Sequence, residues 1–337
     1  MTRPATYDIH AHILELDTVA ALQDALPEIG FALVPIDDES AVLDVAGVKY
    51  RPFPRGGWDV ERRLADMARY GFDRQLLAVS PQTVLYDKPA AAALTASKIQ
   101  NDAIAARCRA NPQSFQGLAT LPMQAPEIAA AELERAMTEG GLVGAMLGTN
   151  IEGRNLDLPE LDVLWARAEA LEAFLLLHPL QVAGIDRQRS YYLQNFIGNP
   201  LDTTIAAACL VFGGVLERFP RLKVCLSHGG GFVPYQQARW IHGWAERAEA
   251  KVRLKGEPGP SIDRLLFDTI LHDVAPLQFL VDLAGADRVM LGTDYPFDMG
   301  QYDLPEVIDS LRITARERET ILAGAAERLL RPAGGAR

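Results

Sequence analysis

The sequence predicts an α/β fold of the (β/α)8 TIM-like barrel type, with a small β-hairpin insertion after the first strand and helices at the carboxyl end. Short apolar runs alternate along the chain with longer segments that carry apolar residues at i, i+3/i+4 and i+7. The short runs are apolar on both faces, as a parallel sheet covered by helices requires. Eight such runs in succession favour a closed barrel.

The expected strands are residues 6–12, 75–80, 115–121, 144–149, 173–179, 222–230, 264–270 and 288–297. The expected helices are residues 59–71, 93–111, 127–140, 158–171, 202–220 and 274–286. Two stretches interrupt this rhythm. Residues 31–58 alternate apolar and polar side chains around acidic and glycine turns, which indicates the β-hairpin insertion, and residues 181–200 are irregular. Long loops of this kind at the carboxyl ends of barrel strands form substrate pockets.

One domain is expected over residues 1–332, because no Pro/Gly/Ser-rich linker divides the chain, and residues 333–337 are expected to be a disordered tail. The net charge of −11 argues against nucleic acid or an anionic membrane as the main partner. No run of about 20 uncharged apolar residues is present that would span a membrane.

The cysteines indicate a cytoplasmic protein. Cys108, Cys209 and Cys225 show no CxxC spacing and lie in apolar or helical segments, as reduced thiols do. The first residues contain no basic segment followed by an apolar core, so we expect no signal peptide.

Histidines and one aspartate stand at the ends of four expected strands. In YDIHAH, His10 and His12 are two residues apart and therefore point to the same side of the first strand. His178 ends the fifth strand, His228 the sixth and Asp294 the eighth. The carboxyl ends of barrel strands share one mouth, so these side chains are expected to converge on one divalent metal ion. Imidazoles with a carboxylate suit Zn²⁺, and Fe²⁺, Mn²⁺ or Co²⁺ accept the same ligand types.

Three or four such ligands would leave a coordination position for water, whose pKa the metal lowers to roughly 7. A histidine that is not needed as a ligand would then serve as the base. A polar, histidine-rich loop is the alternative interpretation of YDIHAH taken alone.

This pattern resembles the amidohydrolase superfamily. Residues 117–137, 199–231 and 289–300 are similar to its α-amino-β-carboxymuconate-ε-semialdehyde decarboxylase group, and the likeness covers nearly the whole chain. The resemblance implies a mononuclear zinc site and the roles of its residues. The implied metal ligands are His10, His12, His178 and Asp294, the implied acid/base is His228, and Asp294 also counts as catalytic.

The resemblance also implies three substrate-binding arginines. Arg51, in KYRP, stands where the family binds a substrate carboxylate, and Arg239 and Arg247 stand where the family has a pair that reaches the neighbouring subunit's site. A guanidinium group binds a carboxylate in a bidentate fork. Trp240 and Trp244 lie on one stripe beside them, which favours a homodimer. The alternatives are solvated surface arginines and tryptophans that pack inward on the barrel.

The chain departs from the family pattern in the loop after the fifth strand. The family has the sequence HPWD where this chain has HPLQ, with Leu180 and Gln181. The family also has tryptophans at the positions where this chain has Tyr191 and Asn195. These departures leave the substrate open. The fourth strand holds no lysine that could bridge a second metal, which favours one ion.

Other histidines and a glycine-rich stretch are expected to have structural roles. The residues 228–231, HGGG, are expected to form a tight turn that frees backbone amides near the metal. His242 is expected at the surface or at a subunit contact, and His272 and Asp273 in a loop at the pocket rim.

The expected function is therefore a metal-dependent, non-oxidative decarboxylase of a small unsaturated or aromatic carboxylic acid. It would use no redox or organic cofactor; His228 would activate a metal-bound water and Arg51 would hold the carboxylate. The alternative is a hydrolase or hydratase with the same site, whose product keeps the carboxylate. A non-enzymatic alternative is a scaffold stabilised by zinc. It is disfavoured because His228 would have no structural role in it.

Overall fold

The computed structural model describes residues 5–330, so the expected tail at 333–337 lies outside the described residues. The parallel strands are β1 (Tyr7–Ile13), β5 (Arg74–Val79), β6 (Phe115–Gly117), β7 (Gly144–Gly148), β8 (Phe174–His178), β9 (Lys223–Leu226), β10 (Leu266–Asp268) and β11 (Val289–Met290). The helices are α1 (Leu16–Ala25), α2 (Val60–Tyr70), α3 (Ala90–Ala110), α4 (Pro126–Thr138), α5 (Asp162–Ala170), α6 (Asn199–Phe212), α7 (Val215–Arg218), α8 (Val233–Glu246), α9 (Gly259–Ile262), α10 (Val274–Ala284), α11 (Leu304–Asp309), α12 (Ala315–Glu319) and α13 (Ala325–Leu329).

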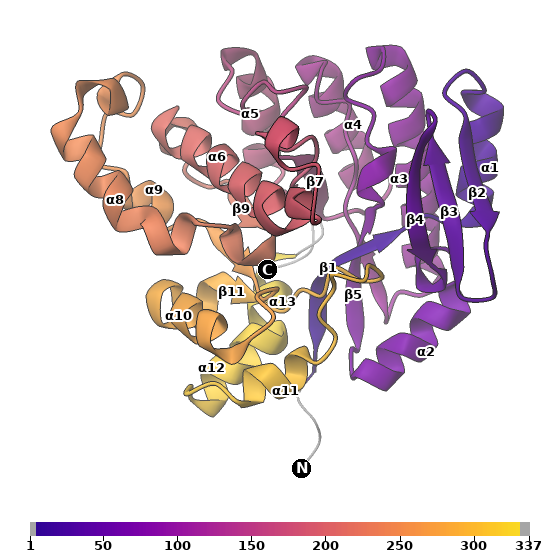
Figure 1. Ribbon diagram of the computed structural model, residues 1–337. Helices are drawn as coiled ribbons and strands as arrows, with labels where there is room; N and C mark the ends of the chain where they lie inside the picture. The colour runs from indigo at the N-terminus through magenta and orange to yellow at the C-terminus, as the bar shows by residue number, and fades with distance from the viewer. Residues whose placement is uncertain (1–4, 331–337) are drawn as a thin grey trace.

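The parallel strands follow one another in the order of a (β/α)8 barrel, with helices packed around them (Figure 1). Strands β1, β5 and β6 form one sheet, and β7 to β11 form a second. Isolated parallel bridges, Ala11 to Tyr295 and Ala119 to Ala145, join the two sheets at both of their edges. The fold class predicted from the sequence is confirmed.

Several expected elements end earlier than the apolar pattern suggests, among them one helix and the last strand. The helix expected over 202–220 is divided into α6 and α7, because Gly214 adopts the left-handed backbone with φ +69°. The strand expected over 288–297 is reduced to β11, and the chain then turns through Asp294, whose φ is +59°. The helix break comes from a backbone conformation that an apolar run does not reveal.

The insertion is an antiparallel sheet of three strands, one more than the expected hairpin: β2 (Phe31–Pro35), β3 (Ser40–Val45) and β4 (Val48–Pro54). The central strand β3 alternates, and its residues Ala41, Leu43 and Val45 are buried. Leu43 and Val45 belong to a second apolar cluster, which also contains side chains of α1, α3 and Phe297. This cluster ties the insertion to the chain segment that follows Asp294.

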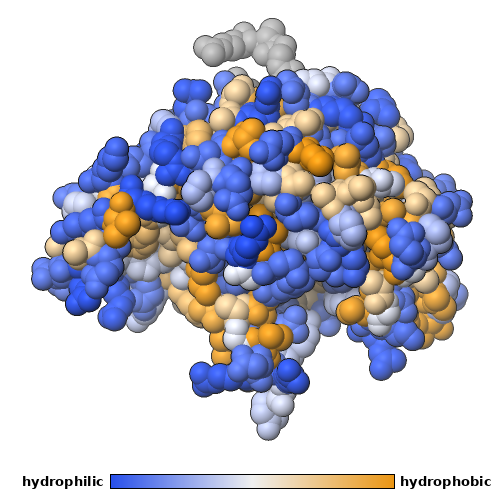
Figure 2. Space-filling model, turned by 90° about the horizontal axis from the view of Figure 1, so that it is seen from above, coloured by the Kyte–Doolittle hydropathy of each residue, from blue (hydrophilic) through white to orange (hydrophobic). Residues whose placement is uncertain are grey.

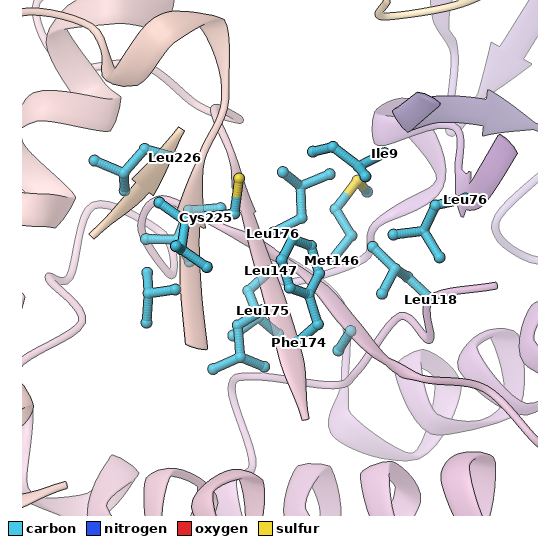
Figure 3. Close-up of a cluster of buried hydrophobic side chains, with 14 of the residues drawn as sticks. Ile9, Leu76, Leu118, Met146, Leu147, Phe174, Leu175, Leu176, Cys225 and Leu226 are labelled. Atoms are coloured by element: carbon cyan, nitrogen blue, oxygen red, sulfur yellow. The ribbon is translucent and has the colours of Figure 1, made fainter. Parts of the chain in front are cut away.

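The main core lies on both faces of the parallel strands. Figure 3 shows part of it, with side chains from β1, β5, β7, β8 and β9 gathered together. The consecutive residues Leu175, Leu176 and Leu177 of β8 are all fully buried, although neighbours in a strand point to opposite faces. Burial of each such side chain contributes about 1.5–3 kcal/mol, so the strands are fixed firmly enough to hold side chains at their ends.

The outer surface is not equally covered. Seen from above, hydrophobic patches lie between hydrophilic residues on both the α8 side and the insertion side (Figure 2). Helix α8 has 14 residues, of which only Val233 is buried, and it projects from the body of the molecule (Figure 1). Within residues 5–330, no helix has the length and apolar character needed to cross a membrane.

Candidate metal centre

Four of the predicted site residues converge at the carboxyl ends of the parallel strands. His10 and His12 lie on β1, His178 is the last residue of β8, and Asp294 follows β11. All four are buried. One atom of each (an imidazole nitrogen or a carboxylate oxygen) lies within 4.8 Å of the corresponding atoms of the other three. Strand alternation and barrel closure thus bring together residues from both ends of the chain.

The nitrogens in the middle of this cluster face one another. The Nε2 atoms of His10 and His12 are 3.1 Å apart, and Oδ1 of Asp294 is 3.1 Å from Nε2 of His12. The same oxygen lies 3.4 Å from Nε2 of His10 and 4.0 Å from Nε2 of His178. The ring planes of the three histidines cross at 76–89°, so the imidazoles approach one point from different directions.

Hydrogen bonds at the opposite ring nitrogens set the tautomers. Nδ1 of His10 lies 2.8 Å from a carboxylate oxygen of Asp268, whereas Nδ1 of His12 lies 2.8 Å from the Val79 carbonyl and Nδ1 of His178 lies 3.0 Å from the Pro179 carbonyl. These partners only accept, so each Nδ1 carries the proton and each Nε2 presents a lone pair.

The donor set fits a divalent metal ion. Nε2 of His178 is buried and has no hydrogen-bond partner among the described residues. A buried polar atom of this kind is costly unless a partner is bound there. Three imidazole nitrogens and one carboxylate oxygen are a ligand set typical of Zn²⁺ and related transition metals.

The electrostatics of the cluster also favour a bound cation. Burial lowers the pKa of His178 to about 3 and lowers the pKa of His12, so both rings are neutral as ligands. For His10, burial lowers the pKa, but the hydrogen bond to Asp268 and the charge of Asp294 together raise it by more than burial lowers it. The net shift of the His10 pKa is therefore upward. Burial would raise the pKa of Asp294, yet its contacts with the histidines hold that pKa well below its usual range. The position therefore attracts positive charge.

His228 stands beside this cluster. It follows β9, and its Nε2 lies 3.5 Å from Oδ2 of Asp294. His12 contacts the other oxygen of this carboxylate, Oδ1. Its ring centre is 5.4 Å from that of His10 and 5.5 Å from that of His178. Nδ1 of His228 is buried without a hydrogen-bond partner in the described part of the chain. The ring is thus close enough to exchange a proton with a group bound at the cluster.

A family model described as Amidohydrolase matches residues 7–331. The chain belongs to the amidohydrolase family. This confirms the family resemblance drawn from the strand-end histidines.

The relatives of this amidohydrolase include named decarboxylases. The 2-amino-3-carboxymuconate-6-semialdehyde decarboxylase of Dictyostelium discoideum is 34% identical over 327 residues, which cover 96% of this chain and 90% of the relative. The crystal structure of 5-carboxyvanillate decarboxylase from Sphingomonas paucimobilis has a TM-score of 0.83 at 25% identity and covers 98% of this chain and 100% of its own. A dihydroxybenzoic acid decarboxylase from Polaromonas, with bound manganese, has a TM-score of 0.80 at 24% identity, with 97% of each chain covered.

The three predicted arginines are not in the histidine cluster of this amidohydrolase. Arg51 is exposed, at a register shift where β4 pairs with β3, and Arg239 is exposed on α8. Within residues 5–330 neither guanidinium group makes a hydrogen bond or ion pair. Arg247 follows α8 and pairs with Glu249 at 2.7 Å. In the described residues, no hydrogen bond or ion pair joins any of these guanidinium groups to the histidine cluster.

An aromatic wall extends from the cluster toward the insertion, and sequence reasoning did not identify it. The ring of Phe297 lies 5.1 Å from that of His12 and 5.4 Å from that of Tyr50. Burial and the charge of Asp298 raise the pKa of Tyr50 and of Tyr192, so both phenols keep their protons. The sequence offered one indication of Phe297, because this residue directly follows Asp294, Tyr295 and Pro296 at the end of the last expected strand.

The loop after β8 exposes the residues that depart from the family pattern. Tyr191 is 86% exposed, and both Tyr191 and Tyr192 have left-handed backbone angles. Gln181 is exposed and its carbonyl accepts a hydrogen bond from Asn150, while Leu180 is half-buried against the main core. Asn195 is half-buried on a short π-helical turn, Gln194–Gly198, that leads into α6.

Two buried carboxylates behind the cluster were missed. Asp8 accepts hydrogen bonds from Thr293 and Gln75, and burial raises its pKa to about 6. Asp268 contacts His10, His228 and Gly229. The expectation that HGGG frees its backbone amides is wrong. The amides of His228 and Gly229 donate to Asp268, and those of Gly230 and Gly231 donate to backbone carbonyls of the same turn.

The remaining histidines lie away from the cluster. His242 is exposed on α8, and His272 is exposed after β10, where its backbone amide donates to Gln301. No lysine occurs in β7. In the described residues, one group of potential metal ligands was found.

Proposed function

We propose that this amidohydrolase is a metal-dependent, non-oxidative decarboxylase of a small unsaturated or aromatic carboxylic acid. The observation that carries the proposal is the identity of 34% to a decarboxylase over 96% of the chain, joined to a buried cluster of three histidines and one aspartate. His10, His12, His178 and Asp294 would hold one divalent ion. When bound, that ion supplies Lewis acidity, which stabilises negative charge as it develops on the substrate.

In the reaction, the bond between the carboxylate carbon and the conjugated system breaks and CO₂ leaves. The electron pair stays with the conjugated system, and a proton takes the place of the carboxylate on carbon. We assign the proton transfer to Nε2 of His228, which lies beside the cluster without being part of it. The aromatic wall of Phe297 and Tyr50 suits a planar substrate.

Arg51 is proposed to bind a substrate carboxylate. A guanidinium fork forms two parallel charge-assisted hydrogen bonds with such a group. Arg51 is free to do so because it is exposed and makes no hydrogen bond or ion pair in the described residues.

We propose Zn²⁺ as the metal on the basis of the histidine-rich donor set. Mn²⁺ is the main alternative, because the decarboxylase from Polaromonas carries manganese. The three free cysteines fit a cytoplasmic protein. Burial raises the pKa of Cys209 to about 11, which keeps this thiol protonated and unreactive.

The working unit is proposed to be a homodimer of one-domain chains (residues 1–332). A groove of about 1010 Å³ runs along α8, lined by Phe212, Phe232, Tyr235, Trp240 and the arginines Arg239 and Arg247 among others. Tyr235 is 78% exposed, and a helix with one buried residue in 14 is unusual unless a partner covers it. A second copy would bury these aromatics and bring Arg239 or Arg247 to the partner's site.

The experiment is an assay for CO₂ release with 2-amino-3-carboxymuconate 6-semialdehyde, 5-carboxyvanillate and 2,6-dihydroxybenzoate, combined with metal analysis of the purified protein. CO₂ release that stops after chelation and returns with Zn²⁺ or Mn²⁺ supports the proposal. A product that gains water and keeps every carboxylate would assign the hydratase reaction instead.

For the dimer, the test is solution mass together with mixing of inactive variants. An Arg239→Ala chain and a His228→Ala chain should each be poorly active, and the mixture should regain part of the activity. A fully active monomer would overturn the shared-site arrangement.

A further inference from the structure

We propose that Asp268 is a positioning residue that couples metal binding by His10 to the placement of His228; the inference rests on the proposed function. Asp268 is the last residue of β10, lies between β9 and β11 and is fully buried. It occupies the same strand-end position as the predicted ligands, but its carboxylate points to their outer side.

The first contact of Asp268 is with a proposed metal ligand. Its Oδ2 accepts the Nδ1 proton of His10 at 2.8 Å. The corresponding nitrogens of His12 and His178 are bound by backbone carbonyls, so His10 is the ligand histidine that a carboxylate supports. A carboxylate in this position fixes the ring and makes its other nitrogen a stronger donor to a metal ion.

The second contact of Asp268 is with the turn that carries His228. The backbone amide of His228 donates to Oδ2 at 2.9 Å, and that of Gly229 donates to Oδ1 at 2.7 Å. His228 has φ +54° and Gly229 has φ +62°, a left-handed conformation that a histidine rarely adopts. Successive amides in such a turn form a small anion-binding nest, and the carboxylate of Asp268 fills it.

One carboxylate oxygen therefore serves both partners. Oδ2 accepts from the His10 ring and from the His228 backbone, while Oδ1 accepts from Gly229 and, at 3.2 Å, from Ile270. All four partners are donors. An asparagine in this place would turn an NH₂ group toward at least one of them, so the exchange removes an acceptor without changing the size of the side chain.

The space around the pair is closed as well. A Cβ atom added at Gly292 would lie 2.9 Å from Cβ of Asp268 and 3.1 Å from Cβ of His10. The absence of a side chain at Gly292 lets these two residues sit at hydrogen-bond distance.

The test compares Asp268→Asn with wild type and with Asp8→Asn. Asp8 is a matched control, because it is equally buried and binds the His10 backbone amide, yet it touches no imidazole nitrogen. Metal affinity of the apoproteins is measured for Zn²⁺ and for Mn²⁺ by competition with a chromophoric chelator, after circular dichroism has verified the fold. We expect Asp268→Asn to bind metal about 10–100-fold more weakly and Asp8→Asn to bind it as wild type does.

The coupling to His228 is read from turnover at saturating metal. Asp268→Asn should remain slower than wild type when its site is fully loaded, because its His228 turn has lost an acceptor. Wild-type metal affinity in Asp268→Asn, or complete recovery of turnover by added metal, would overturn the proposal.

A second measurement needs neither a variant of Asp268 nor a substrate. In protein labelled with ¹⁵N-histidine, the His10 Nδ1 proton should appear as a far-downfield, exchange-protected resonance that is absent from His10→Asn; its absence from wild type contradicts the contact. Affinity and resonance decide on Asp268 even if wild type releases no CO₂, which would refute only the proposed function.

Discussion

The histidine cluster and helix α8 represent two ways in which this chain presents functional side chains. In the cluster, each of the three proposed ligand histidines is buried and its outer nitrogen is hydrogen-bonded, so the ring orientation is fixed before anything binds. On α8, one residue of 14 is buried, and the side chain of Arg239 has no hydrogen-bond or ion-pair partner within residues 5–330. The four groups of the cluster lie within one chain, whereas α8 lacks the contacts that would fix the side chain of Arg239. Changes in the cluster should therefore act at any protein concentration, and changes on α8 should act through assembly.

The largest effect is expected for His178→Ala. This change removes one of the four proposed metal ligands and leaves a cavity beside the Asp294 carboxylate. The protein should therefore lose its metal and all measurable turnover. Metal content is measured by mass spectrometry after gel filtration. His242→Ala on α8 is the matched control and should keep full metal content, since His242 is exposed. Full occupancy in His178→Ala would remove this residue from the ligand set.

His228→Ala should divide metal binding from turnover. The residue lies beside the four ligands, so the variant should keep its metal while kcat falls about 10²–10⁴-fold, the usual contribution of a positioned acid or base. Steady-state kinetics and metal analysis on the same sample provide the measurement. A variant that loses its metal together with its activity would make His228 a ligand.

Arg51→Ala tests an exposed residue that lies on the insertion rather than on α8. Loss of a charge-assisted carboxylate contact is worth about 1.5–3 kcal/mol, which corresponds to roughly 10–150-fold in kcat/KM. The effect should be the same at low and high enzyme concentration, because the proposed contact lies within one chain. A loss that disappears at high concentration would place Arg51 in the interface.

The smallest effect on the chemistry is expected for Tyr235→Glu on α8. Tyr235 is 78% exposed, so the fold should tolerate the charge, whereas the proposed dimer should weaken by about 2 kcal/mol, or roughly 30-fold in its dissociation constant. Sedimentation and activity are measured over a dilution series. Val48→Glu, at a side chain 72% exposed on the insertion, is the control and should leave the mass unchanged. Equal sedimentation of Tyr235→Glu and wild type would contradict the proposed interface.

The convergence of the three histidines and Asp294 could be predicted from the sequence because two simple rules determine it. Alternation in a strand puts His10 and His12 on one side, and parallel strands bring His178 and Asp294 to the same end of the barrel. The same rules could have found Asp268, which also ends a strand. It was passed over because one aspartate in an apolar run has no spacing that marks it as a partner of histidine.

Other features could not be predicted from local pattern. The aromatic wall requires the insertion to fold back onto Phe297, and that contact depends on the second apolar cluster. The left-handed turn at His228 depends on a carboxylate 40 residues away in the chain. Both are long-range contacts between segments whose own sequences favour several conformations.

The contact between β1 and the segment after β11 determines when, during synthesis of the chain, the site can be completed. His12 and Asp294 are 282 residues apart in the chain and 3.1 Å apart in space. A nascent chain emerging from the ribosome therefore holds these histidines long before the carboxylate has been made, and the full donor set exists only after Asp294 has been added. An ion that bound all four donors would join β1 to the segment after β11, so it could stabilise only a chain whose synthesis has passed the last strand of the barrel.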